Sequence, residues 1–257
     1  MFDISGLIPE AQPVAERVAE VFWKHTQPWF IGLVCVGSAV RGGITRGGSD
    51  IDFLLYLKDD VYRADGDFPM YLWLSIQRDL AGVSPTPFVH IDAKVARAEL
   101  ERGEVGPIPG NYHLLYGHVP VPEATSANLK QQAIWELDRL PSSVDFLREG
   151  VFHLERGGAD IARKVRKMTE TVWPIVYDLL ALQARDAVDV WCWPKNLAVE
   201  RMVLSAALAT TIHDFYRAVT AFYPSADSIE HALAVIESGT AFLQAAKKWH
   251  LQDTQMI

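Results

Sequence analysis

Two carboxylates and a glycine-rich loop stand close together in the first quarter of the chain. The sixteen residues from Gly37 to Asp52 read GSAVRGGITRGGSDID. Asp50 and Asp52 alternate with isoleucine at the start of an apolar run, and residues two apart on a strand point to the same face, roughly 7 Å from each other. Such carboxylates repel each other unless a cation lies between them, and Mg²⁺ prefers hard oxygen ligands. The pattern therefore predicts a divalent-metal site with Asp50 and Asp52 as ligands.

The loop before these aspartates has the composition of a phosphate-binding segment. If a helix begins at Gly37-Ser38, its first amides and the Ser38 hydroxyl offer an anion site. Arg41 and Arg46 would add positive charge, and Ser49 lies directly before the first aspartate. The glycines are not followed by Gly-Lys-Ser/Thr, so this is not a Walker loop. The alternative is an Asp-x-Asp pair that only caps a turn or lies solvated at a strand end, but the order of strand, Gly-Ser, arginines and apolar run favours a functional site.

The elements that must position this segment differ between the two halves of the chain. Apolar periodicity predicts a mixed α/β first half, with helices over 9–24 and 70–80, strands over 30–36, 50–57 and 88–95, and short strands that include Leu114–Tyr116. The second half predicts helices over 126–149, 158–188, 195–222 and 227–250, with a kink at Pro174. We therefore expect an α+β chain with domains at 1–122 and 123–257, the second an antiparallel helical bundle.

The segments Val36–Ser38 and Asp50–Leu55 together resemble the signature of a known family. An apolar residue, Gly-Ser, a spacer of about a dozen residues and Asp-apolar-Asp are typical of the nucleotidyltransferase superfamily, which includes DNA polymerase β and the aminoglycoside nucleotidyltransferases. The resemblance implies a mixed sheet with flanking helices in the first domain. It also implies two aspartates that bind Mg²⁺ in a two-metal site, a Gly-Ser turn that holds the triphosphate, and a third carboxylate on a later strand.

One residue is the best candidate for that third carboxylate. Asp92 lies in the apolar segment Phe88–Val95, where it would bind metal or act as general base for the acceptor hydroxyl. The alternative is that Asp92 ends the strand and caps a turn, but a buried strand seldom carries an unpaired carboxylate. Glu104 is the reserve candidate. His90 shares the face of Asp92 and is interpreted as a packed or supporting residue, not as a ligand.

The helical half offers one residue for nucleotide binding. Lys195 follows Trp193-Pro194 at an expected helix start, where a lysine opposes the helix dipole unless an anion is near. Small-molecule nucleotidyltransferases often carry a lysine at a similar helix start, so the resemblance implies that Lys195 contacts the triphosphate; simple solvation is the alternative.

Composition limits the partners and the compartment. The net charge of −8 argues against general nucleic-acid binding and suits a cationic substrate. The two cysteines suggest no disulfide framework, and no uncharged apolar stretch is long enough to span a membrane. We expect a cytoplasmic protein.

These observations predict a Mg²⁺-dependent nucleotidyltransferase. It would move a nucleoside monophosphate, expected to be AMP, from ATP or another NTP to a hydroxyl of a small molecule. An aminoglycoside-like antibiotic is the favoured acceptor, which would connect the chain to antibiotic resistance. Two alternatives remain open: an antitoxin-type enzyme that adenylylates a protein, and a non-catalytic nucleotide-binding or interaction module.

Overall fold

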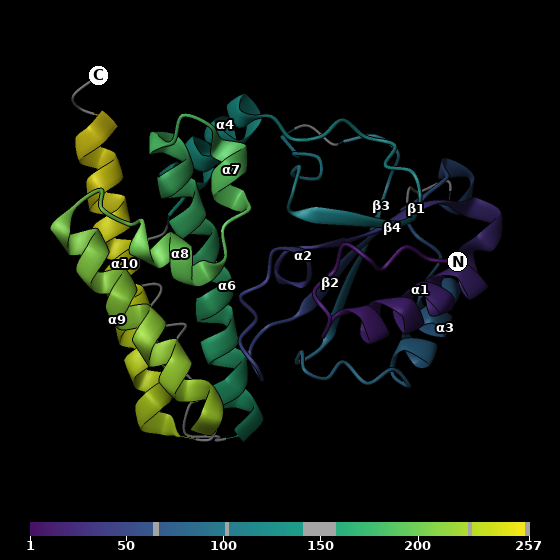
Figure 1. Cartoon of the computed structure of the whole chain (residues 1–257), viewed down its shortest axis with the longest axis horizontal. Coiled ribbons are helices and arrows are strands. Elements are labelled where there is room, and N and C mark those ends of the chain that lie inside the picture. Colours follow the sequence, from purple (N-terminus) through teal and green to yellow (C-terminus); the bar gives the residue numbers. More distant parts are fainter. Residues whose placement is uncertain (64–66, 101–102, 141–157, 226–227, 255–257) are drawn as a thin grey trace. The chain divides into compact units, whose positions relative to one another are not determined.

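The computed structural model places the chain in two compact units, Met1–Ala124 and Thr125–Ile257. It describes residues 1–63, 67–100, 103–140, 158–225 and 228–254 (Figure 1). The first unit combines a sheet with helices, and the described part of the second unit is built from helices. The expected α+β fold class is confirmed.

Four strands in the order β3-β2-β1-β4 form the sheet of the first unit. Their bounds are Phe30–Val36 for β1, Ile51–Leu57 for β2, Ile91–Ala96 for β3 and Tyr112–Gly117 for β4. β1 pairs antiparallel with β2 and with β4, whereas β2 and β3 run parallel. The sheet is therefore mixed, as expected.

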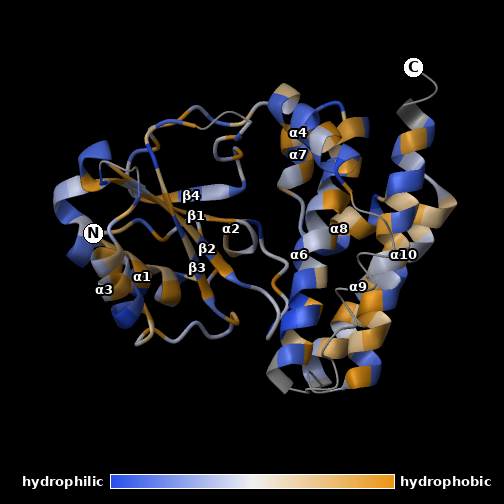
Figure 2. Cartoon of the chain, turned by 180° about the vertical axis from the view of Figure 1, so that it is seen from behind, coloured by the Kyte–Doolittle hydropathy of each residue, from blue (hydrophilic) through white to orange (hydrophobic). Residues whose placement is uncertain are grey.

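One face of this sheet is covered by α1 (Gln12–Thr26) and α3 (Met70–Leu80). Alternate residues of the central strands, such as Leu33, Phe53 and Leu55, are buried against these helices. In Figure 2 the central strands are almost wholly hydrophobic, whereas α1 and α3 carry both colours, as amphipathic helices should. Because side chains alternate along a strand, the neighbours of these core residues, Asp52 among them, face the opposite side of the sheet.

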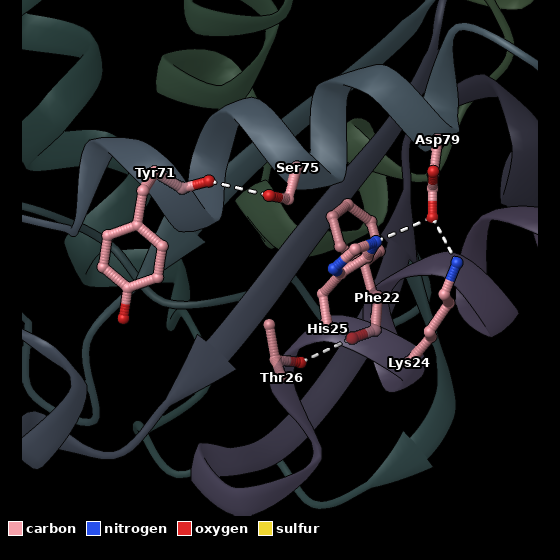
Figure 3. A network of polar contacts seen from close by, with 7 residues as sticks. All are labelled: Phe22, Lys24, His25, Thr26, Tyr71, Ser75 and Asp79. Atoms are coloured by element: carbon pink, nitrogen blue, oxygen red, sulfur yellow. Dashed lines mark hydrogen bonds and ion pairs between the residues drawn. The ribbon is translucent and has the colours of Figure 1, made fainter.

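A polar contact joins the two covering helices at the protein surface (Figure 3). The carboxylate of Asp79 on α3 accepts from Lys24 Nζ at 2.7 Å and lies 2.8 Å from His25 Nε2, both on α1. These contacts lower the pKa of Asp79, Lys24 first and His25 second. α1 and α3 are thus held together by these charged contacts as well as by apolar packing.

Several predicted boundaries in the first unit shift by a few residues. α1 begins at Gln12, β2 at Ile51 and β3 at Ile91, so Asp50 lies one residue before its strand and Phe88 precedes the third strand. The reason for the later start of β3 is a turn, in which Phe88 N donates to Pro85 O at 2.8 Å. A short 3-10 helix at Gln27–Trp29 precedes β1, and another at Asp59–Val61 follows β2.

The second unit divides more finely than its apolar periodicity suggests. Its helices are α4 (Ser126–Asp138), α6 (Gly158–Gln183), α7 (Ala187–Trp191), α8 (Lys195–Glu200), α9 (Ala206–Phe222) and α10 (Ile229–Thr254), with a 3-10 turn at Tyr223–Ser225. The single helices predicted over 158–188 and 195–222 are wrong, because Asp186 and Ser205 cap new helices by accepting from Val188 N and Leu208 N. Residues 141–149 of the first predicted helix lie outside the described residues.

The remaining features of these helices can be stated briefly. Pro174 lies inside α6, whose helical span continues through it; the kink stays a prediction. None of the helices in the described ranges combines the length and the apolar character that crossing a lipid bilayer demands.

A buried acid in α6 gives this unit a testable dependence on pH. Asp178 is 2% exposed, and burial, followed by the charge of Glu136, raises its pKa to about 8. Between about pH 4 and pH 8 the folded chain therefore keeps a proton that the unfolded chain releases, so stability falls as pH rises, by at most about 1.4 kcal/mol per pH unit.

We predict that Asp178→Asn removes this slope, so that the variant gains stability over wild type as pH rises from about 4 to 8. Urea denaturation at several pH values measures it. Asp189→Asn, at an exposed carboxylate in the same unit, should keep the wild-type slope. Parallel profiles for wild type and Asp178→Asn would contradict the prediction.

Candidate active site

The first strand ends in a turn that only glycine adopts easily. Gly37 has φ +73° and ψ −135°, and α2 (Ser38–Arg41) begins directly after it. The turn is held by a hydrogen bond from Gly37 N to Asn111 O, 2.9 Å long, which ties it to the segment before β4. The predicted helix start at Gly37-Ser38 is therefore present, although the helix is a single turn and Ser38 is nearly buried. The first N–H groups of a helix have no hydrogen-bond partner within it and can donate to a bound anion.

The rest of the glycine-rich loop leads the chain to the aspartates. Ser49 N donates to Thr45 O and Thr45 N donates to Ser49 Oγ, each at 2.8 Å, which closes a compact turn. The buried Ser49 hydroxyl thus accepts a hydrogen bond from within the loop. Arg46 lies exposed in this turn, and Arg41 lies partly buried at the end of α2. Both arginines flank the Gly37 turn in sequence, and their contact with a phosphate stays a prediction.

Strand pairing brings the second and third predicted carboxylates together. In the parallel ladder of β2 and β3, Asp52 is the register partner of Asp92. Register partners on neighbouring strands share a face and lie about 4.8 Å apart along the hydrogen-bonding direction. Both residues are partly exposed, whereas Ile51 and Phe53 on either side of Asp52 are buried in the core. Two acids that are far apart in sequence therefore form an adjacent pair.

Asp50 meets a different partner one row earlier. Its Oδ1 lies 2.6 Å from Nδ1 of His90, and the two side chains are 18% and 29% exposed, respectively. Asp50 precedes Asp52 by two residues, as His90 precedes Asp92, so the two pairs follow each other along the same pair of strands. The predicted carboxylates thus lie at one end of the sheet, with His90 among them.

The turn and the carboxylate pair are direct neighbours. A Cβ placed on Gly37 would lie 3.5 Å from Oδ2 of Asp52, and Val36 is the register partner of Asp52 across β1 and β2. The charge of Asp52 also reaches Cys35, whose pKa is raised first by burial and second by this carboxylate. Asp52 therefore lies between the Gly37 turn on one side and Asp92 on the other.

The donor set suits a hard cation that shares its shell with a substrate. Within the described ranges, no three Asp, Glu, His or Cys side chains converge into a ready-made metal cluster. Mg²⁺ does not require one, because it commonly binds one or two carboxylates and fills its shell with phosphate oxygens and water. Asp52 and Asp92 supply such a carboxylate pair, and the absence of a side chain at Gly37 leaves room beside it.

The two other predicted residues, Glu104 and Lys195, are described by different contacts. The charge of Glu104 contributes, after burial, to raising the pKa of Tyr56 to about 12, and Tyr56 lies four residues after Asp52 on β2. Lys195 belongs to the second unit, where it begins α8 and its Nζ lies 5.2 Å from the centre of the Trp173 ring. Of the two acids, Asp92 is the register partner of Asp52; its role as third carboxylate and the role of Lys195 stay predictions.

Two polar residues on the same face were not singled out from the sequence. Lys94 follows Asp92 by two residues, is exposed and is the register partner of Leu54. Tyr112 is the register partner of Val36, and its hydroxyl donates to Glu123 Oε1 at 2.5 Å. The alternation of strand side chains identifies Lys94 once Asp92 is placed, whereas Tyr112 becomes visible only when β4 is paired with β1.

Comparison with known proteins decides the family of this site. Residues 22–112 match the family model described as the nucleotidyltransferase domain. The chain contains a nucleotidyltransferase domain. The matched range includes the Gly37 turn and all three candidate carboxylates, so the carboxylates that pairing gathers belong to the nucleotidyltransferase domain itself. No curated protein gives a significant match to the sequence.

A solved structure extends the likeness to the fold of the chain. Spectinomycin adenyltransferase AAD(9) from Enterococcus faecialis, solved with ATP and spectinomycin, matches with a TM-score of 0.52 at 12% sequence identity, over 92% of this chain and 98% of that one. At that identity the match shows a shared fold. The match of residues 22–112 shows a nucleotidyltransferase domain, and the structural match shows that the chain shares its fold with this adenyltransferase.

The Gly37 turn of the nucleotidyltransferase domain gives a test with a matched control. Gly37→Ala and Gly47→Ala both force alanine into a positive φ, +73° and +75°, and such backbone strain costs about 1–3 kcal/mol. Only the Cβ at position 37 has Asp52 beside it; at position 47 nothing lies within 4 Å.

We therefore predict that both variants lose stability in urea denaturation, whereas only Gly37→Ala weakens Mg²⁺·ATP binding in calorimetry. Equal ATP affinity in both variants would show that the turn is not part of the nucleotide site.

Proposed function

We propose that the chain transfers AMP from ATP to a hydroxyl of a small cationic acceptor of the aminoglycoside type. Nucleotidyl transfer as the reaction class follows from the nucleotidyltransferase domain at residues 22–112. The identity of donor and acceptor is our inference, supported by a structural neighbour that was solved with ATP and spectinomycin. The net charge of −8 also favours a cationic acceptor.

The observation that carries the proposal is the adjacency of Asp52, Asp92 and the Gly37 turn. The turn would hold the triphosphate through the first amides of α2, with Arg41 and Arg46 adding positive charge. Gly37 and Ser38 form the start of α2 and Ser49 closes the loop, which would approach the phosphates. The α-phosphate would then lie next to the carboxylate pair, which is where bond exchange must occur.

Mg²⁺, as one ion or two, is the cation that we assign to Asp50, Asp52 and Asp92. When bound, it would neutralise phosphate charge and lower the pKa of the attacking hydroxyl. Asp52 would orient the donor against the Gly37 turn. Asp92, on the outer side of the pair, would accept the proton of the acceptor hydroxyl as its oxygen attacks the α-phosphorus. The new P–O bond forms as the bond to pyrophosphate breaks, so pyrophosphate leaves with the electron pair.

The proposal predicts selective loss of transfer in isosteric variants. Asp52→Asn and Asp92→Asn keep side-chain volume but lose charge, and each should reduce the transfer rate by at least about 100-fold. Asp60→Asn, at an exposed carboxylate in the 3-10 helix after β2, should transfer normally. Thermal denaturation of all three variants confirms that they fold.

The measurement is transfer of radiolabel from α-labelled ATP, GTP, CTP or UTP to spectinomycin and other aminoglycoside-type antibiotics. The same reactions with lysate proteins test the alternative acceptor, a protein. Label on a protein band and none on any small molecule would overturn the acceptor class. Retained nucleotide binding with no transfer to either would favour a non-catalytic binding module.

A further inference from the structure

Lys94 lies on the same face of the sheet as Asp52 and Asp92. Its neighbours Ala93 and Val95 pack against the core that contains α1 and α3, whereas Leu54, its register partner on β2, packs against the apolar cluster of the opposite face. Asp92 precedes Lys94 by two residues, so the two side chains point to the same side, with their Cα atoms roughly 7 Å apart. A positive charge therefore stands next to the row of Asp52 and Asp92.

The Lys94 ammonium can reach a molecule that is bound beside Asp92. The side chain is exposed, and within the described part of the chain it makes no ion pair. Lysine carries a compact ammonium on a flexible four-carbon stem. Under the proposed function, Asp92 is the carboxylate nearest to the acceptor, so Lys94 lies on the acceptor side of the carboxylates.

A site built from carboxylates alone would place the wrong group of a cationic acceptor next to Asp92. Opposite charges attract, so Asp50, Asp52 and Asp92 would bind an ammonium group in preference to an uncharged hydroxyl. A protonated amine has no lone pair and cannot attack the α-phosphorus, so binding of this kind is unproductive. A positive charge beside Asp92 disfavours an ammonium at that position and leaves a hydroxyl almost unaffected.

A lysine on an edge strand has a second explanation. β3 lies at the end of the strand order, and charged side chains on edge strands oppose pairing with another chain. This explanation requires a charge on the strand but no relation to Asp92. It predicts that a variant without the charge aggregates and that the binding of cations does not change.

We propose that Lys94 is a specificity-determining residue, whose ammonium keeps the charged amines of the acceptor away from Asp92, so that a hydroxyl occupies the position beside this carboxylate. The inference rests on the proposed function. It adds to that function a reason why an acidic site modifies a hydroxyl of a cationic molecule.

The test uses 1,3-diaminopropane, which carries two ammonium groups and no hydroxyl, as an inhibitor of AMP transfer to the small-molecule acceptor. Two unit charges 5 Å apart in water change binding by about 4-fold, and by more in a lower dielectric. Lys94→Met should therefore lower the inhibition constant by at least about 4-fold, in competition with the acceptor. Lys94→Arg should resemble wild type, as should Lys58→Met at an exposed lysine directly after β2.

Two further readouts separate this role from protection of the sheet edge. Unproductive binding of the acceptor lowers kcat and KM together, so both should fall in Lys94→Met. In EDTA, without nucleotide, 1,3-diaminopropane should raise the melting temperature of Lys94→Met more than that of wild type. If Lys94→Met aggregates, Lys94→Gln, which keeps polarity but loses the charge, decides in its place.

The outcomes distinguish this inference from the function on which it rests. If wild type labels a small molecule but the charge-free variants and wild type are inhibited equally by the diamine, only the role of Lys94 is overturned. A rise in the KM for ATP with unchanged inhibition would also overturn it, because Lys94 would then contact the nucleotide. If wild type labels no small molecule, the proposed function falls, and the role of Lys94 falls with it.

Discussion

The parallel pairing of β2 with β3 is the constraint on which the site depends. It makes Asp52 and Asp92 register partners and places Asp50 opposite His90 one row earlier. A shift of one residue in this register would turn one member of each pair to the opposite face. The register is secured by the core, because Ile51, Phe53 and Leu55 are buried under α1 and α3. The apolar face of the sheet therefore determines the geometry of its polar face.

The site divides its tasks between rigid strands and a glycine turn. Carboxylates that must stay close despite their repulsion are carried by strands, where backbone pairing opposes their separation. In the proposed function the phosphates would contact the Gly37 turn, where a side chain would strain the backbone and fill the space beside Asp52. The parts meet because Val36, the last residue of β1, is the register partner of Asp52. The pairing of β1 with β2 would thus bring the Asp52 carboxylate next to the bound nucleotide.

The sequence predicted those parts of the site that are local. Short sequence patterns were enough to predict the Asp50-Ile51-Asp52 segment, the Gly37-Ser38 turn and the apolar strands. The adjacency of Asp52 and Asp92 does not, because forty residues separate them and their pairing depends on how α3 returns the chain to the sheet. The His90 contact follows from that same register. In the second unit, the caps Asp186 and Ser205 were visible in the sequence, but the apolar periodicity continues across both breaks and concealed them.

Electrostatics connects the site to the kind of acceptor that it would favour. The polar face carries Asp50, Asp52 and Asp92 at one end, and the row of Asp52 ends at Tyr112, which is hydrogen-bonded to Glu123. Burial, followed by Glu123, raises the pKa of Tyr112 to about 12, so the phenol stays neutral at neutral pH. A bound cation would balance the carboxylates against the triphosphate, but not this outlying acid. The remaining charge would attract an amine and repel an anionic acceptor, and for that reason we favour a cationic small molecule over a nucleic acid.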